Sequence, residues 1–412
     1  MHKIERIELF HINVHLEKPF YPSWIPGYPQ THVRYTLLKL VTGDGIVGYG
    51  AGNAFSFERS GLGDLLGNFL IGIEADDLKT VRMRLREASY LGWRNWWIES
   101  AFYDLMGKIQ NKPVYKLLQD GEEETVTGAK VYASTGELKN IEARRPYLDD
   151  IRGKGISAVK IRVKDPERKD DVTILKDVRK ELGDDFTIAV DANQGWPVSL
   201  IEPTPIWDLP YAVNFGKACD ELNIAWIEEP LDMHDWDGMA NLRKAVKTPI
   251  AGAELHGDWH EIRAVFERDC LDIYQPDATF AGGLTVSKKV MAECRRRKLR
   301  FSPHTWTNGI GLLVNLHAFA AWEKRELLEY PYEPPGWVPK FRDGIIPPIE
   351  VNPDGTIDVP QEPGLGITII PSRLRKYGKR FYKATPFRVA VKAVLEKGLK
   401  TALELKKKRS RG

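Results

Sequence analysis

Three carboxylates in this sequence each come directly after a short apolar run of the kind that forms a buried strand. Taken singly, each is as readily a salt-bridge partner or a helix cap. If the runs are neighbouring strands of one parallel barrel, the carboxylates meet at a single opening, because the carboxyl ends of such strands converge there. Oxygen donors with open coordination positions suit Mg²⁺ far better than zinc. The three residues are Asp191, Glu228 and Glu254.

Further ionisable residues follow the other apolar runs. Lys160 and Arg162 lie two positions apart in one run, so both side chains point to the same side of a strand. A buried pair of cations requires anions, which the three carboxylates or a substrate carboxylate supply. Asp277 and His304 follow two neighbouring runs, where the carboxylate can orient the imidazole and raise its basicity. Glu329 follows the last run.

The elements that position these residues begin near residue 129. Eight short β-rich runs alternate with helical segments over roughly 200 residues, which predicts a parallel sheet closed into a barrel by crossover helices. The helical segments include 170–182, 259–268 and 286–298. The eight predicted strands are Val131–Ala133, Ala158–Val163, Thr187–Val190, Ala225–Ile227, Ile250–Ala251, Leu271–Tyr274, Arg300–Ser302 and Leu327–Leu328.

An antiparallel pattern precedes the barrel. Ile4–Val14 and Tyr35–Val41 alternate as strands do, and the second run turns at Gly43–Gly45 into Ile46–Tyr49, which is a hairpin signal. Between these strands, Pro19–Gln30 combines aromatic residues with prolines and predicts a lid or a packed loop.

The rest of the chain is mostly helical. Residues 78–118 carry apolar side chains at helical spacing, interrupted at Pro113, and predict consecutive helices. After residue 340 the chain is rich in proline and glycine, and it ends in an amphipathic run, Phe387–Leu405, that predicts a terminal helix. Residues 396–412 carry seven cations against two carboxylates, a net charge of +5. We expect this tail to be a solvated or frayed terminus.

Composition excludes several classes of protein. The 412 residues, 42% of them hydrophobic, suffice for two packed units, and the sequence lacks the apolar runs of a membrane-spanning helix or a signal peptide. We therefore expect a cytoplasmic protein. The net charge of +3 becomes −2 without the tail, which argues against nucleic-acid binding. Three scattered cysteines, Cys219, Cys270 and Cys294, predict buried thiols and neither a disulfide framework nor a zinc site.

A set of ordered motifs resembles the enolase superfamily, with the spacing of its mandelate racemase-like group. The resemblance covers nearly the whole chain except the last 30 or so residues, and it includes the Glu99–Leu118 segment. The barrel motifs are Val190–Trp196, Trp226–Pro230, Ala251–Glu254, the region of Asp277, and Ser302–His304.

This resemblance implies an α/β fold in which an α+β cap domain covers a modified TIM barrel of (β/α)₇β type. We expect the cap to span residues 1–128 and the barrel, with the active site, residues 129–340. Residues 341–412 are then a C-terminal segment that returns to the cap and ends in the basic tail. The family also favours a symmetric homo-oligomer.

The resemblance also implies roles for individual residues. In such enzymes Mg²⁺ and cationic side chains stabilise the dianionic enolate, so that a weak carbon acid loses its α-proton to an ordinary base. Asp191, Glu228 and Glu254 resemble the Mg²⁺ ligands, His304 with Asp277 resembles the dyad whose histidine is the base, Glu329 resembles the acid that hydrogen-bonds the enolate oxygen, and Glu229 lies behind a ligand.

One departure from the family pattern bears on the reaction. The pattern has Lys-x-Lys, whose second lysine is a base opposite the histidine, whereas this chain reads Lys160-Ile161-Arg162. A guanidinium, with a pKa above about 12, is a poor base and a good anion ligand. The sequence therefore favours a one-base reaction, in which His304 removes the α-proton and then protonates a departing β-hydroxyl. That is dehydration of a sugar acid, a small-molecule carboxylate, to a 2-keto-3-deoxy acid.

Two other functions stay open at this stage. One is a racemase or epimerase of a 2-hydroxy acid or an amino-acid derivative, and the other is a catalytically silent barrel used as a binding or scaffold protein. We expect Asn193, Trp306 and Tyr28 to shape the substrate pocket. His256 and His260 lie four residues apart, but a structural or solvent-facing role is the simpler interpretation.

Overall fold

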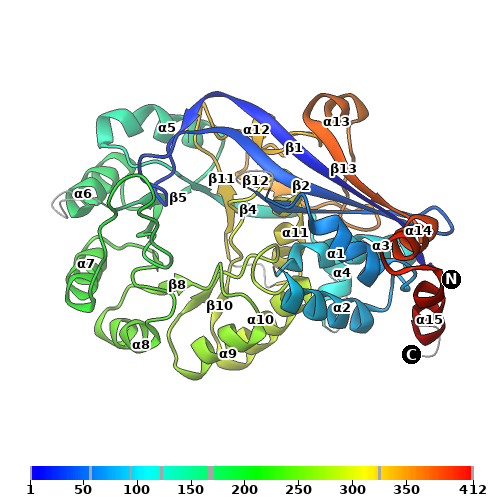
Figure 1. Cartoon of the computed structure of the whole chain (residues 1–412). Coiled ribbons are helices and arrows are strands. Elements are labelled where there is room, and N and C mark those ends of the chain that lie inside the picture. Colours follow the sequence, from blue (N-terminus) through cyan, green and yellow to red (C-terminus); the bar gives the residue numbers. More distant parts are fainter. Residues whose placement is uncertain are drawn as a thin grey trace.

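The computed structural model describes residues 2–54, 58–92, 94–120, 124–164, 171–322 and 326–409. The chain forms two sheets, one antiparallel and one closed into a barrel (Figure 1). No helix within these ranges is long and apolar enough to cross a membrane. Cys219, Cys270 and Cys294 are buried and free, as predicted.

The antiparallel sheet has the strand order β13-β1-β2-β3. Its strands are β1 (Ile4–Phe20), β2 (Gln30–Thr42), β3 (Val47–Asn53) and β13 (Gly378–Ala384). The predicted hairpin between β2 and β3 is confirmed, with Gly45 at φ +89° in its turn. The first strand runs six residues further than the predicted end at Val14, because Leu16 and Phe20 remain buried.

Helices cover one face of this sheet. They are α1 (Leu62–Leu70), α2 (Leu78–Leu91), the short 3₁₀ turn η1 (Trp96–Ile98), α3 (Glu99–Ile109) and α4 (Val114–Leu118). Leu9 and Leu38 from the sheet pack with Leu66 and Phe102 from the helices into a core of their own. The break before α4 falls at Pro113, as predicted.

All eight predicted barrel strands are present. They are β4 (Gly128–Ser134), β5 (Ala158–Arg162), β6 (Thr187–Asp191), β7 (Ile227–Glu228), β8 (Ile250–Gly252), β9 (Ile273–Tyr274), β10 (Arg300–Phe301) and β11 (Leu328–Pro331). Parallel pairing runs from β10 through β9 to β4 and on to β11. Ser302 Oγ, donating to the carbonyl of Leu327 at 2.7 Å, joins the two ends of the sheet.

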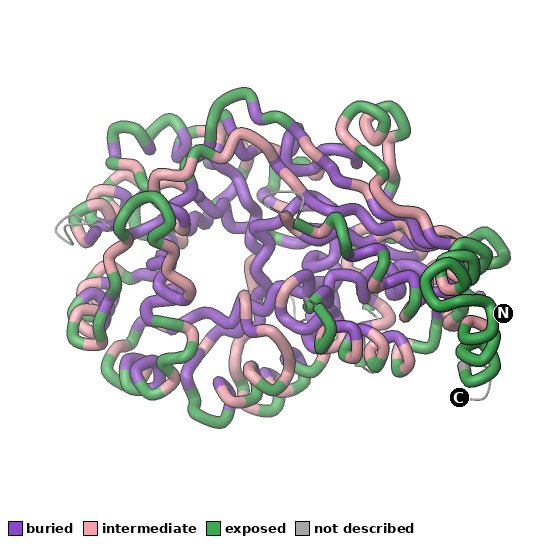
Figure 2. The backbone as a smooth tube through the Cα atoms, viewed as in Figure 1, coloured by how far each residue is buried: buried purple, intermediate pink, exposed green. Residues whose placement is uncertain are grey.

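One helix follows each of the first seven barrel strands, which gives the (β/α)₇β order. The helices are α5 (Ile141–Gly153), α6 (Asp171–Leu182), α7 (Leu209–Glu221), α8 (Trp236–Ala245), α9 (Trp259–Glu267), α10 (Leu284–Arg297) and α11 (Gly309–Ala320). Most form an outer ring whose inner faces are buried and outer faces exposed (Figure 2). The predicted start of α6 at Asp170 lies outside the described residues.

The last segment returns to the cap. It contains α12 (Pro339–Arg342), β12 (Thr356–Asp358), α13 (Pro371–Tyr377), β13, α14 (Pro386–Lys397) and α15 (Leu399–Arg409). Strand β12 pairs with β4, and β13 pairs antiparallel with β1. The prediction of one terminal helix over Phe387–Leu405 is wrong, because Gly398 ends α14 at φ +80°, a conformation that favours glycine. The boundaries at residues 128 and 340 stay a prediction.

Candidate active site

The barrel brings the predicted ionisable residues to one place, although they span 169 positions of sequence. They lie on strands β5, β6, β7 and β11 or directly after β8, β9 and β10. Every one of them is at most 6% exposed. The eight are Lys160, Arg162, Asp191, Glu228, Glu254, Asp277, His304 and Glu329.

Lys160 contacts three carboxylates of this cluster. Its Nζ lies 2.5 Å from Glu228 Oε1, 2.7 Å from Glu329 Oε1 and 3.4 Å from Asp191 Oδ2. Burial alone lowers the pKa of Lys160, but the surrounding carboxylates more than reverse this, so its pKa is raised. Lys160 is therefore held as an ammonium ion and cannot accept a proton near neutral pH.

Arg162 is fixed from three sides. Its Nη1 pairs with Asp191 Oδ2, and its Nε donates to the carbonyl of Thr135 at 2.6 Å. The guanidinium also lies 5.2 Å from the ring centroid of Trp24 and 5.6 Å from that of Trp306. Burial lowers the pKa of Arg162, but Asp191 and the other carboxylates of the cluster together outweigh it, so the pKa is raised. These contacts suit a fixed anion ligand.

The three predicted metal ligands differ in electrostatic environment. The pKa of Asp191 is lowered, because Arg162 and Lys160 together outweigh the effect of burial. Burial raises the pKa of Glu228 to about 7 despite Lys160, and burial also raises that of Glu254. Two further hydrogen bonds hold these carboxylates, from Gln275 Nε2 to Glu228 Oε2 and from Trp196 Nε1 to Glu254 Oε1, both at 2.8 Å.

Each of the three carboxylates forms an ion pair with a cationic side chain of the protein itself. Asp191 pairs with Arg162, Glu228 with Lys160, and Glu254 Oε2 with His304 Nε2 at 3.3 Å. No group of three or more His, Cys, Asp or Glu side chains in the described ranges is arranged to hold a metal ion. The donor set itself fits a hard divalent cation, since three carboxylates from successive strands face one volume and raise one another's pKa by repulsion.

His304 and Asp277 form the predicted pair. His304 Nδ1 lies 3.0 Å from Asp277 Oδ2, while Asp277 Oδ1 accepts hydrogen bonds from Thr279 and from Asn315 Nδ2. This fixes the imidazole with Nε2 toward Glu254. Burial lowers the pKa of His304, but the carboxylates of Glu254, Glu329 and Asp277 together outweigh burial and raise the pKa to about 10.

Glu329 is held as a carboxylate. Its Oε1 accepts from Ser134 Oγ at 2.7 Å as well as from Lys160, and its Oε2 accepts from the Thr305 amide at 2.6 Å. Burial raises its pKa, but Lys160, His304 and Arg162 lower it to about 2. The role of Glu329 as the acid beside the enolate oxygen stays a prediction.

A cavity of about 270 Å³ opens above this cluster. Arg162, Glu254 and His304 reach it from the barrel, and the predicted pocket residues Asn193 and Trp306 line it too. Five aromatic side chains line it, and its other side belongs to the cap. The cap contributes Trp24 from the loop between β1 and β2, Gln30 and Arg34 from β2, and Asn53 from β3. Trp196, Phe280 and Trp337 also line the cavity.

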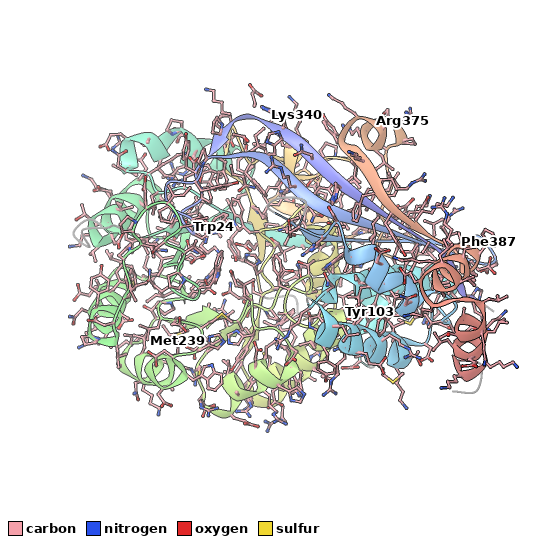
Figure 3. The ribbon with its side chains drawn as sticks, in the orientation of Figure 1. Trp24, Tyr103, Met239, Lys340, Arg375 and Phe387 are labelled. Atoms are coloured by element: carbon pink, nitrogen blue, oxygen red, sulfur yellow. The ribbon has the colours of Figure 1, made fainter. Side chains whose placement is uncertain are left out.

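Tyr28 does not line this cavity. It lies beside a separate, smaller one with Thr31 and His32. Its segment is a packed loop, as predicted, but the residue that faces the substrate cavity is Trp24, between β1 and β2 (Figure 3). An aperiodic loop gives no sequence signal for which of its aromatic side chains points inward.

Several residues near the site were not predicted. Lys164, two positions beyond Arg162, is buried and donates to the carbonyl of Asn193 at 3.2 Å, and burial lowers its pKa to about 8. The alternation of β5 could have revealed it. Ser23 Oγ donates to Asn193 Oδ1 at 2.7 Å and ties the packed loop to the barrel.

The remaining candidates lie away from the cavity. His256 is buried, with its pKa lowered by burial to about 4, while His260 is exposed, so the two do not form a pair. Glu229, at φ +46°, lines a small cavity together with His256, separate from the larger one. This is compatible with the prediction that Glu229 lies behind a ligand.

Comparison with known proteins agrees with this geometry over most of the chain. Residues 8–119 match the mandelate racemase/muconate lactonizing enzyme N-terminal domain, and residues 145–373 match the enolase C-terminal domain-like family. The chain belongs to the enolase superfamily. Within it, the match of both domains places the chain in the mandelate racemase/muconate lactonizing enzyme family.

The similar members of this superfamily include sugar-acid dehydratases. The chain is 27% identical over 375 residues to L-talarate/galactarate dehydratase of Salmonella typhimurium, covering 85% of this chain and 86% of that protein. It is 28% identical over 365 residues to arabinonate dehydratase of Saccharolobus solfataricus, covering 84% and 91%. A solved structure of the Salmonella enzyme, liganded with Mg and L-lyxarohydroxamate, matches with a TM-score of 0.77 at 25% identity over 93% of this chain and 94% of that one.

Members of comparable identity also include a cycloisomerase and a racemase. Membership of the superfamily therefore leaves the reaction open among these classes, and the arrangement of individual residues must be used to choose between them.

Proposed function

We propose that this protein dehydrates a sugar acid to a 2-keto-3-deoxy acid by one-base chemistry. The observation that carries the proposal is the contrast between the two sides of the site. On one side His304 is oriented by Asp277 with Nε2 directed inward, and on the other both β5 cations are locked by carboxylates. A racemase of this type needs a base on each face, and neither Lys160 nor Arg162 serves as one.

In this proposal the substrate carboxylate lies beside Arg162, the β5 cation that lines the cavity. Asp191, Glu228 and Glu254 are the residues that would hold Mg²⁺, whose charge supplies stabilisation for the carboxylate as it gains electron density. The aromatic walls and the cap side chains exclude water from the rest of the substrate.

His304 moves the proton. Glu254 is the carboxylate that raises the pKa of His304 most. A second cation bound to Glu254 would offset the negative charge of this carboxylate, lower the pKa of His304 and so favour the neutral imidazole. Neutral His304 then takes the α-proton through Nε2 as the Cα–H bond breaks. The imidazolium returns a proton to the β-hydroxyl as the C–O bond breaks and water leaves, and the enol tautomerises to the 2-keto acid.

The test is a panel of aldonic and aldaric acids incubated with purified protein and Mg²⁺. We expect a 2-keto acid, detected with semicarbazide, from at least one member, and solvent deuterium at C3 of the product in D₂O. The absence of product from a broad panel would contradict the proposal. Exchange of the α-proton for deuterium without loss of water would replace it with racemisation or epimerisation.

A further inference from the structure

The terminal helices α14 and α15 expose an unusual number of large hydrophobic side chains. Of the fifteen large hydrophobic side chains that are exposed among the described residues, seven lie on these two helices. Both helices are almost wholly exposed at the edge of the molecule away from the barrel (Figure 2), and Figure 3 places Phe387 there. The seven are Phe387, Val391, Val394, Leu395, Leu399, Leu403 and Leu405.

The apolar face of α14 is held outward. At 3.6 residues per turn Phe387, Val391 and Leu395 share one side of the helix, while Val389 lies on the opposite side and packs against the cap core. Lys392 Nζ adds an ion pair with Asp64 Oδ1 on α1 at 2.5 Å. The helix is thus anchored through one face, and its apolar face points to solvent.

These helices also concentrate net positive charge. Residues 386–409 contain eight cations and two carboxylates, a net charge of +6, so the remainder of the protein is at −3. Arg388 lies beside the apolar face of α14, and Lys406–Lys408 extend the charge along α15. The family matches end at residue 373, before both helices.

We propose that α14 and α15 form a docking surface for an anionic phospholipid membrane. An amphipathic helix with apolar side chains on one face and lysine and arginine beside them lies in the lipid–water interface, held by burial of the apolar face and by attraction to acidic headgroups. A second copy of the chain would bring two +6 surfaces together, which repel. RNA would use the cations and leave the aliphatic side chains without a partner.

The experiment is co-sedimentation of the full-length protein with vesicles. We expect binding to phosphatidylcholine vesicles containing about 30% phosphatidylglycerol, little binding to pure phosphatidylcholine, and weakening as salt is raised. The exposed-residue variants Leu395→Asp/Leu399→Asp and Lys406→Glu/Lys408→Glu should each reduce the bound fraction about tenfold, because one removes the apolar contact and the other the charge attraction.

Lys244→Glu/Lys247→Glu is the matched control, since these exposed lysines lie on a separate basic groove at the barrel. This variant should bind vesicles like the parent. The proposal is overturned by equal loss in the control, by equal binding to both vesicle types, or by no binding to either. It is also overturned if Leu395→Asp/Leu399→Asp converts a dimer to a monomer in sedimentation velocity, or if only RNA binding depends on the lysines.

Discussion

At the barrel opening eight charged side chains are buried, whereas on α14 and α15 seven large hydrophobic side chains are exposed. Both regions depart from the usual distribution of side chains: the first buries charged groups, and the second exposes hydrophobic ones. The charges at the opening are paired so closely that removing one leaves another unpaired in the interior, which is costly. The exposed side chains of the helices have few neighbours to lose. Changes at the opening should thus affect activity and folding, and changes on the helices should affect neither.

The largest effect is expected at His304. The variant His304→Asn keeps a side chain of similar reach but removes the base, so kcat for the dehydration should fall about a thousandfold. Initial rates of 2-keto acid formation measure this. His260→Asn, on the exposed histidine of α9, should retain the parent rate; a similar loss in both variants would contradict the assignment of His304.

The next effect is on stability. Arg162→Met leaves Asp191 buried beside Lys160 alone, and it should lower the free energy of unfolding by about 3 kcal/mol in urea titrations. Arg145→Met breaks the largely exposed pair with Glu181 and should leave the free energy of unfolding nearly unchanged. Similar losses in the two variants would mean that burial of an ion pair does not determine how much unfolding free energy is lost when the pair is broken.

A smaller effect concerns His317 on α11, which is fully buried and accepts a hydrogen bond from the Tyr115 amide through Nδ1. Burial lowers its pKa from 6.5 to about 4. The unfolded chain therefore binds a proton before the folded one, so the stability this group contributes is present above pH 6.5 and is lost as pH falls toward 4.

Between pH 7 and pH 5 this loss should amount to about 2 kcal/mol. Urea titrations of the parent and of His317→Gln at both pH values measure it, because the variant lacks the titrating group. If the difference in unfolding free energy between the two proteins is the same at pH 7 and pH 5, the assignment to His317 fails.

The smallest effect is expected at the far end of the chain. Removing α15 by ending the chain after Lys397 should leave the melting temperature and kcat within error of the parent, since its exposed side chains contribute little to any core. Differential scanning calorimetry and the 2-keto acid assay check this. A clear fall in either would show that the two regions are coupled.

The sequence predicted the barrel and its charged opening because both follow from short-range patterns. The eight runs have the length of strands, a charge after each run falls at the same end of a parallel sheet, and the two-residue period of β5 places Lys160 and Arg162 together. Ordered motifs then added the family. These are properties of neighbouring residues and of strand order, which a sequence displays directly.

The features that the sequence did not predict depend on tertiary contacts, which leave no periodic pattern in the sequence. The choice of Trp24 over Tyr28 is decided by how one loop packs against Arg162 and Trp306. The distribution of Lys160 and Arg162 among the carboxylates depends on tertiary distances, and Lys164 was overlooked although it continues the alternation of β5. The interruption at Gly398 is a local backbone choice that the amphipathic pattern on both sides concealed.

The pairing of β13 with β1 has a consequence for biosynthesis. A ribosome makes β13 more than 350 residues after β1, so one edge of the cap sheet remains open until residues 378–384 have been made. A chain interrupted before residue 378 would possess every barrel strand and yet display an unpaired edge, which is the kind of surface that chaperones and proteases recognise.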